Sequence, residues 1–196
     1  MQLSKTAQEI KNRHNAKFEE EANYKPSFYN AFQFPKIPII TNKNRDSIDL
    51  YNWGLIPKWA KDISIREYTL NARIETINQK PAFKSSINNR CLIITDGFFE
   101  WQWLDEKGKS KQKYKIQFPD KSIFSIAGLW SEWYDEKNNT LYKTYTLLTT
   151  EANELMSVIH NSKKRMPVIL LPNFEDDWLD GATPNNNELE LVAERF

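Results

Sequence analysis

Hydrophobic and polar residues alternate along 69–76, and further stretches rich in β-branched and aromatic residues are also expected to be β-strands. The stretches are 48–54, 69–76, 91–103, 112–118, 123–133 and 141–150. Polar turns, DEKGK at 105–109 and DEKNN at 135–139, separate the last four stretches into two pairs. The pattern therefore predicts two β-hairpins, with 91–103 forming one long strand.

Helical spacing is limited to three short segments. Thr6 and Glu9 have the spacing of a capping box, which predicts a polar helix through about Lys17. Apolar residues within 151–160 recur at helical spacing and predict a second helix, with the apolar stripe Ala152, Leu155, Met156 and Ile159. The segment FEDDWLD at 174–180 predicts a short final helix.

The remaining segments complete the expected domain. MPVILLP at 166–172 predicts a buried strand, 24–38 an irregular packed segment, and the tail from Gly181 with its asparagine run a loose end. Hairpins outnumber strand–helix–strand units. We therefore expect an α+β fold that is β-rich and mainly antiparallel.

Composition narrows the class of protein. A length of 196 residues predicts a single domain, 1–196, with a sizeable core. Because 27 basic residues nearly balance 26 acidic ones, no overall field attracts nucleic acid or membrane, and a DNA contact would need a local basic site. One cysteine and two histidines make a disulfide and a metal site unexpected, and no cofactor motif is present. The polar N-terminus predicts a soluble, cytoplasmic protein without a membrane segment, and we expect a monomer.

Glu100 lies within the aromatic stretch TDGFFEWQW at 95–103. In a strand, Phe98, Glu100 and Gln102 share one side. A glutamate in this setting either lies at an exposed edge, forms a salt bridge, or is held on a partly apolar face for proton transfer.

A second polar face is predicted at LNARIET, 70–76. Alternation places Asn71, Arg73 and Glu75 on one side of the strand. This face either lines a cleft or is an exposed surface with an Arg–Glu pair of about 0–1 kcal/mol.

Basic residues and the single thiol leave further alternatives. His160 follows a predicted helix, where it suits proton transfer near neutral pH or simply caps the last carbonyls. The lysines and arginine of 163–165 either bind phosphate or form a solvated face. The lysines at 107, 109, 111 and 113 are interpreted as protection of an edge strand. Cys91, in an apolar strand, is expected to be inert packing.

Four motifs occur in order along the chain: WGLIPKW at 53–59, LNARIET at 70–76, RCLIITDGFFEW at 90–101 and IHNSKKRMPVIL at 159–170. Together they resemble the SOS-response-associated peptidase family, whose members are also called abasic site processing proteins. The resemblance implies a barrel-like core with a few flanking helices. It also implies a partner, single-stranded DNA with abasic sites, and a covalent reaction with that partner.

The implied reaction joins the protein to the lesion through an N-terminal cysteine exposed by removal of the initiator methionine. Its amine forms an imine with the sugar aldehyde, and its thiol then closes a thiazolidine ring at little entropic cost. The resemblance also implies removal of the leading methionine by the same site, a self-processing peptidase activity.

The family's functional residues map onto seven positions of this chain. The resemblance implies catalytic roles for Asn71, which holds the amino end, Glu100, which transfers protons, and His160, which assists opening of the sugar ring. It implies DNA contacts for Arg73 at a phosphate and Trp59 stacked on a base, with Thr149 and Arg165 as further phosphate contacts.

The chain departs from the family pattern at its amino end. Residue 2 is Gln2, and LSKTAQEI resembles the family's opening helix, so we expect the cysteine-bearing strand upstream and a further segment beyond VAERF. The segment 29–34 also diverges from the family's DNA-cleft loop. A non-covalent module for single-stranded or junction DNA is the alternative function.

Overall fold

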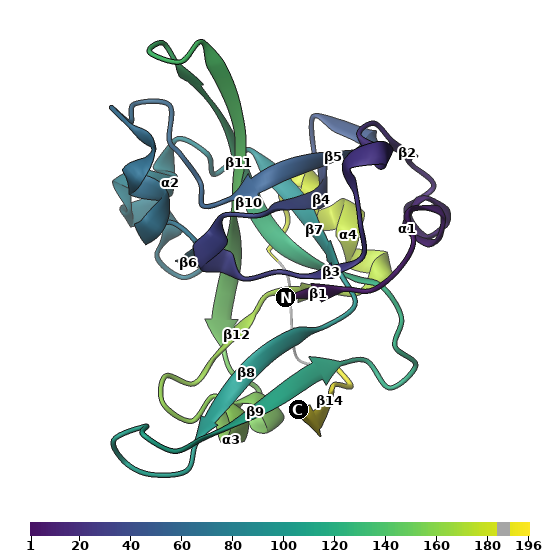
Figure 1. Cartoon of the computed structure of the whole chain (residues 1–196), viewed down its shortest axis with the longest axis vertical. Helices are drawn as coiled ribbons and strands as arrows, with labels where there is room; N and C mark the ends of the chain where they lie inside the picture. Colours follow the sequence, from purple (N-terminus) through teal and green to yellow (C-terminus); the bar gives the residue numbers. More distant parts are fainter. Residues whose placement is uncertain (184–188) are drawn as a thin grey trace.

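A closed five-stranded β-barrel forms the centre of the computed structural model, which describes residues 1–183 and 189–196. Around the ring the strands follow the order β11-β10-β7-β4-β5, and parallel pairing of β5 with β11 closes it (Figure 1). The other neighbours in the ring are antiparallel. The bounds are β4 Lys36–Thr41, β5 Asn44–Trp53, β7 Arg90–Thr95, β10 Phe124–Asp135 and β11 Thr140–Glu151. The predicted β-rich α+β class with a barrel-like core is confirmed.

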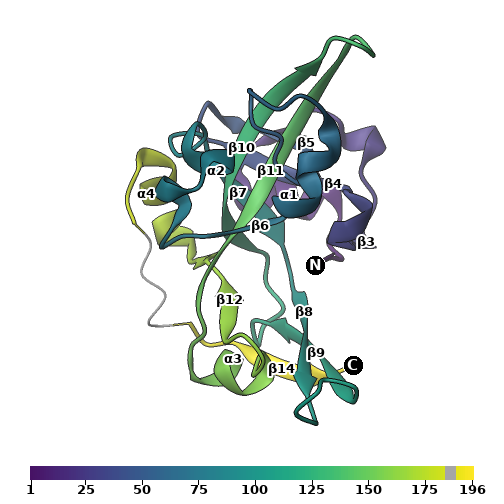
Figure 2. The same ribbon diagram turned by 90° about the vertical axis from the view of Figure 1, so that its left-hand side faces the viewer.

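A three-stranded antiparallel sheet lies at one end of the molecule. Its order is β14-β9-β8, with bounds β8 Phe98–Trp103, β9 Lys111–Gln117 and β14 Val192–Arg195. Helix α3, Glu154–Ile159, lies beside this sheet, and the N-terminus lies between it and the barrel (Figures 1 and 2). The junction of barrel and sheet therefore gathers both ends of the chain.

Short elements cover the barrel and extend its sheet. The remaining strands are β1 Gln2–Leu3, β2 Lys17–Phe18, β3 Ser27–Phe28, β6 Asn71–Arg73, β12 Arg165–Pro167 and β13 Ile169–Leu170. The remaining α-helices are α1 Ala7–His14, α2 Pro81–Lys84 and α4 Glu175–Asp180. The 3₁₀ turns are η1 Glu21–Asn23, η2 Ala31–Gln33, η3 Ile63–Tyr68, η4 Ile77–Gln79 and η5 Pro172–Phe174. Among the described residues, no helix combines the length and apolar character needed to span a membrane.

Local sequence signals account for several of these elements. Both predicted hairpins are confirmed as β8–β9 and β10–β11. The capping box is also present, because the Thr6 hydroxyl accepts the Glu9 N–H at 3.2 Å and the Glu9 carboxylate accepts the Thr6 N–H at 2.7 Å. Helix α1 ends at His14, earlier than predicted, because Asn15 adopts a left-handed conformation with φ of 48°. The predicted final helix is α4.

The prediction of one strand over 91–103 is wrong. The chain leaves the barrel after Thr95, and β8 begins at Phe98 in the other sheet. Residues from the amino end hold the break: the Thr95 hydroxyl donates to the Gln2 carbonyl at 2.6 Å, and buried Asp96 accepts the Ser4 N–H at 3.0 Å. The hydrophobic pattern within 91–103 cannot predict this break, because the residues that hold it lie at positions 2–4 of the chain.

The C-terminal tail is also more ordered than predicted. Residues 192–195 form β14, which pairs with β9 so that Val192 lies opposite Gln117. The asparagine run at 185–187 lies outside the described residues. β14 pairs with residues 114–117 of β9 and β8 pairs with the other side of the strand, so β9 is central over these residues; the lysines at 107, 109, 111 and 113 precede the stretch that β14 covers. The predicted strand at 166–172 is divided between β12 and β13, and the irregular segment 24–38 contains β3, η2 and the start of β4.

The core lies on both sides of the barrel wall. Tyr145 is fully buried and its ring stacks on Trp53, with centroids 5.9 Å apart, where β5 and β11 close the barrel. Cys91 is fully buried as predicted, and burial raises the pKa of its thiol well above the ordinary value. The only thiol in the sequence is therefore part of the core.

Candidate functional site

A cavity of about 990 Å³ lies where the barrel meets the three-stranded sheet. We call it the site cavity. Its lining includes all three predicted catalytic residues and three of the four predicted DNA contacts: Asn71, Glu100, His160, Arg73, Thr149 and Arg165. Trp59 does not line it; the indole is 55% exposed and its N–H donates to the Pro81 carbonyl at 3.4 Å. The structure thus brings six of these side chains together and leaves Trp59 apart.

Strand β6 presents Asn71 and Arg73 to the cavity. It pairs in parallel with β11, so that Asn71 lies opposite Leu147 and Arg73 opposite Thr149. Ala72 between them is buried, which confirms the predicted alternation over these three residues. The strand ends at Arg73, and the alternation does not continue to Glu75 as strand structure.

Glu75 forms its ion pair with Arg165 rather than with Arg73. Its two carboxylate oxygens accept hydrogen bonds from the Arg165 guanidinium, each at 2.9 Å, and the same guanidinium donates to the Thr149 carbonyl at 2.8 Å. Such bidentate pairs are stronger than single contacts and fix both side chains. The interpretation of an Arg73–Glu75 pair is therefore wrong.

Arg73 is left as an exposed cation on the cavity wall. Among the described residues it makes no ion pair, whereas Arg165 has its guanidinium occupied by Glu75 and Thr149. An arginine without a carboxylate partner is free to bind an anion such as a phosphate. Of the two arginines, Arg73 is therefore the better placed for such a contact.

Glu100 is half-buried on β8 rather than solvated at an edge. Burial raises the pKa of its carboxyl above the ordinary value, while the charges of His160 and the chain's amino group and the Trp101 N–H act in the opposite direction. A carboxyl group with a raised pKa carries a proton more often near neutral pH, so it is suited to donate and accept protons.

His160 caps the end of α3 and its ring orientation is fixed. The backbone N–H of His160 donates to the Met156 carbonyl at 2.7 Å. The ring Nδ1 lies 2.7 Å from the Arg165 carbonyl oxygen. Because a carbonyl can only accept, Nδ1 carries a proton, which leaves Nε2 as the ring nitrogen that can gain or lose one. The predicted helix-end position is confirmed, and the ring is equipped to exchange a proton.

The amino group of Met1 also lies at this cavity, a position that alternation along the sequence did not reveal. It donates to the Tyr29 carbonyl at 3.0 Å, and the Tyr29 N–H donates to the Met1 carbonyl at 2.8 Å. Burial lowers the pKa of the amino group from 8.0 to about 6, with Glu100 opposing and Lys113 adding to the shift. An amine with this pKa is largely neutral, and therefore nucleophilic, at pH 7.

Sequence reasoning also missed the residues that form the outer wall of the cavity. Lys113 and a group of phenylalanines line it: Phe28, Phe99 and Phe196. The register of the β8–β9 hairpin places Lys113 opposite Trp101, a pairing that follows from the predicted turn at 105–109. The contribution of Phe28 and Phe196 depends on pairings far apart in the chain.

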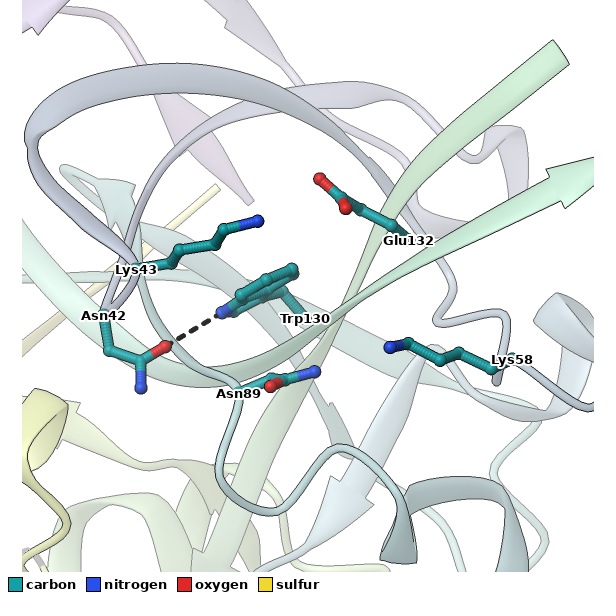
Figure 3. A pocket seen from close by; sticks show the side chains of 6 residues that line it. All are labelled: Asn42, Lys43, Lys58, Asn89, Trp130 and Glu132. Atoms are coloured by element: carbon teal, nitrogen blue, oxygen red, sulfur yellow. Dashed lines mark hydrogen bonds between the residues drawn. The ribbon is translucent and has the colours of Figure 1, made fainter.

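A second, smaller cavity of about 310 Å³ is lined by none of the predicted site residues. Figure 3 shows the amino groups of Lys43 and Lys58 on either side of the Trp130 indole, whose N–H donates to Asn42 at 3.1 Å. No group of three or more His, Cys, Asp or Glu among the described residues is arranged to hold a metal ion. The chemistry suggested by the sequence is therefore concentrated in the site cavity.

Comparisons with known proteins agree with the fold and the motifs. The family model described as SOS response associated peptidase (SRAP) matches residues 1–196. The abasic site processing protein YoqW of Bacillus subtilis (strain 168) is 39% identical over 180 residues, 91% of this chain and 78% of that protein. The abasic site processing protein HMCES of Gallus gallus is 30% identical over 206 residues, 88% of this chain and 59% of that protein.

Solved structures show the same architecture. A protein from Bacteroides thetaiotaomicron superimposes with a TM-score of 0.88 at 32% identity, covering 99% of this chain and 90% of the other. A protein from Bordetella bronchiseptica superimposes with a TM-score of 0.81 at 23% identity, covering 100% of this chain and 97% of the other, and therefore has the same fold.

Proposed function

Because the chain belongs to the SOS response associated peptidase family, we propose that it processes abasic sites in DNA, binding a single strand in the site cavity. One observation carries the proposal: the amino end of the chain meets Glu100 and His160 in a cavity that also contains Arg73, which makes no ion pair with any residue the structure describes. These groups have the chemistry needed to hold a phosphate and to react with the aldehyde of an opened sugar.

The proposed reaction begins with attack of a neutral amine at the chain's amino end on the aldehyde carbon. Proton transfer to the resulting hydroxyl lets it leave as water and forms the imine, and Glu100 is the proton donor. His160, held by the Arg165 carbonyl, exchanges the proton that opens the sugar ring, and Asn71 orients the amino end. Arg73 binds the phosphate beside the lesion.

A stable ring product requires a thiol on the residue that bears the amine. In the 196 residues the only cysteine is Cys91, which is fully buried and lies in the core. In this chain the amine of residue 1 is the one beside Glu100, so a cysteine placed at that position brings a thiol to the amine for a direct test of the ring-closing step.

The test is a variant with Met1→Cys behind an added initiator methionine, whose removal exposes the cysteine and is verified by intact mass. We expect it to form a heat-stable band with a uracil-excised single strand on a denaturing gel. Met1→Ser, made in the same way, keeps the amine but lacks the thiol, so its band should require borohydride reduction. Absence of any band for either variant, with or without borohydride, would contradict the proposal.

Non-covalent recognition of single-stranded or junction DNA is the second candidate, favoured by the burial of the only thiol. It predicts that the chain binds DNA reversibly with an affinity that falls with salt. The Met1→Cys experiment separates the two, because a binding module without aldehyde chemistry gives no band even after reduction.

Replacing Arg73 with alanine should weaken binding of the unaltered chain to single-stranded DNA about tenfold at moderate salt. The expected reason is loss of one phosphate contact, so the slope of log K against log salt should also become shallower by about 0.7. Fluorescence anisotropy over a salt series measures both. Lys17→Ala, an exposed cation away from the cavity, is the control, and equal effects of the two changes would argue against a phosphate at Arg73.

A further inference from the structure

An exposed group of aromatic rings borders the site cavity. Phe28 on β3, Phe99 on β8 and Phe196 after β14 have ring centroids 5.0 to 6.3 Å apart. We call these three rings the aromatic wall. Phe28 is 66% exposed and Phe196 is 62% exposed, so the rings contact one another without being covered.

Lys113 lies over two rings of the aromatic wall. Its Nζ is 4.1 Å from the centroid of Phe99 and 4.2 Å from that of Phe196, distances typical of cation–π contacts. The Phe196 N–H donates to the Lys113 carbonyl at 2.9 Å, which fixes the last segment against β9. The result is a cation held at a defined place on an aromatic surface.

Leaving these rings in water forgoes a considerable stabilisation. Full burial of a phenylalanine side chain is worth about 1.5–3 kcal/mol, so clustered exposed rings are typical of a binding surface rather than of an unused one. The surface is continuous with the cavity that contains Glu100 and His160. An occupant of the aromatic wall is therefore adjacent to the proposed reaction.

The charge on this surface selects the class of occupant. Lys113 projects into it, and Arg73 and Lys163 line the same cavity, so the partner should combine a planar apolar face with negative charge. A single-stranded nucleic acid has both features in every nucleotide. A second copy of the chain, related by a two-fold axis, would instead bring two Lys113 ammonium groups together.

We propose that the aromatic wall stacks against an unpaired nucleobase next to the abasic site, and that Lys113 binds the phosphate of that nucleotide. The inference rests on the proposed function and adds a subsite that explains how an undamaged neighbour positions a lesion lacking its own base. Base–aromatic stacking tolerates any sequence because every base has a π face, so this subsite contributes affinity without sequence preference.

The experiment pairs a protein change with removal of a base from the DNA. Anisotropy is measured on a labelled deoxyadenosine strand with a central tetrahydrofuran residue, a stable abasic analogue, and on strands lacking in addition the 5′ or the 3′ neighbouring base. We expect the chain to lose about tenfold in affinity on one of the two altered strands. Phe196→Ala should reduce affinity for the original strand about tenfold. On the strand that lacks the stacked base, the same change should cause no further loss of affinity. Phe28→Ala should give the same two results.

Three controls make the outcome decisive. Phe174→Ala, at a half-exposed ring on η5 outside the cavity, should leave all affinities unchanged. Lys113→Gln should make the salt dependence shallower by a slope of about 0.7, whereas Lys109→Gln at the exposed hairpin turn should not. Sedimentation reports whether the wall instead joins two copies of the chain.

If Phe196→Ala and removal of the neighbouring base reduce affinity independently, so that their effects add, the ring does not stack on that base. The proposed function would be unaffected by this result. An unchanged salt slope in Lys113→Gln would remove the phosphate contact. Dimerisation that disappears in Phe196→Ala would assign the wall to a second copy of the chain. Failure of the unaltered chain to bind any of the strands would overturn both this inference and the proposed function.

Discussion

Replacement of Glu100 by glutamine should slow capture of an abasic site by the Met1→Cys variant by about 100-fold or more, the range expected for loss of a general acid. The carboxyl group is half-buried on β8, and burial raises its pKa above the ordinary value. Glutamine keeps the shape and can form hydrogen bonds, but it cannot release a proton to the departing hydroxyl. Timed denaturing gels measure the rate of cross-link formation.

The pH dependence of this rate gives a second readout. An amine at position 1 has a pKa of about 6, so the rate should rise as the pH increases through that value and the amine loses its proton. The profile should also contain a limb along which the rate falls as the pH increases through the raised pKa of Glu100, because the protonated carboxyl is the acid. The glutamine variant has no group titrating there and should lose this falling limb while keeping the rising one.

Glu106→Gln serves as the matched control for Glu100→Gln. Glu106 is an exposed carboxylate in the turn of the same hairpin, and its change should leave the rate and its pH profile unaltered. If the Met1→Cys variant reacts equally fast with glutamine or glutamate at position 100, a group other than Glu100 transfers the proton.

Replacement of Tyr145 by alanine should reduce the free energy of unfolding by about 3–5 kcal/mol, as large-to-small changes of aromatic core residues do. Tyr145 is fully buried and stacks on Trp53 where the parallel pair β5–β11 closes the barrel. Trp53 lines the site cavity and its indole N–H donates to the Leu70 carbonyl at 2.8 Å, directly before Asn71. The loss should therefore also loosen β6 and weaken DNA binding.

Urea unfolding measures this effect, and Tyr145→Phe is its control. The Tyr145 hydroxyl is buried and has no hydrogen-bond partner among the described residues. Removing such a group relieves a desolvation cost. The free energy of unfolding of Tyr145→Phe should therefore equal that of the parent or exceed it by up to about 1 kcal/mol. A loss in Tyr145→Phe close to that of Tyr145→Ala would mean that the hydroxyl, and not the ring packing, stabilises the closure.

Local patterns were sufficient for much of the fold. The β8–β9 and β10–β11 hairpins, the Thr6–Glu9 capping box and the helix before His160 depend on residues within one turn or one strand pair. Such elements can be predicted because backbone periodicity and capping act between near neighbours. The alternation that places Asn71 and Arg73 on one side of the strand could be predicted for the same reason.

Several features of the site were decided by contacts between distant segments. The sequence did not indicate that Thr95 and Asp96 would be held by residues 2–4, that 192–195 would cover β9, or that Glu75 would pair with Arg165. Each depends on which strands become neighbours when the barrel closes. The hydrophobic period within a strand says which side is buried but not which partner covers it.

The sequence by itself determined the β-rich class, the hairpins and the side chains suited to proton transfer and phosphate binding. Only the tertiary structure decided that Glu100 and His160 meet the amino end in one cavity and that Trp59 lies outside it. The physical reason is that local backbone preference acts over a few residues, whereas the cavity arises from strand pairing and barrel closure across the whole chain.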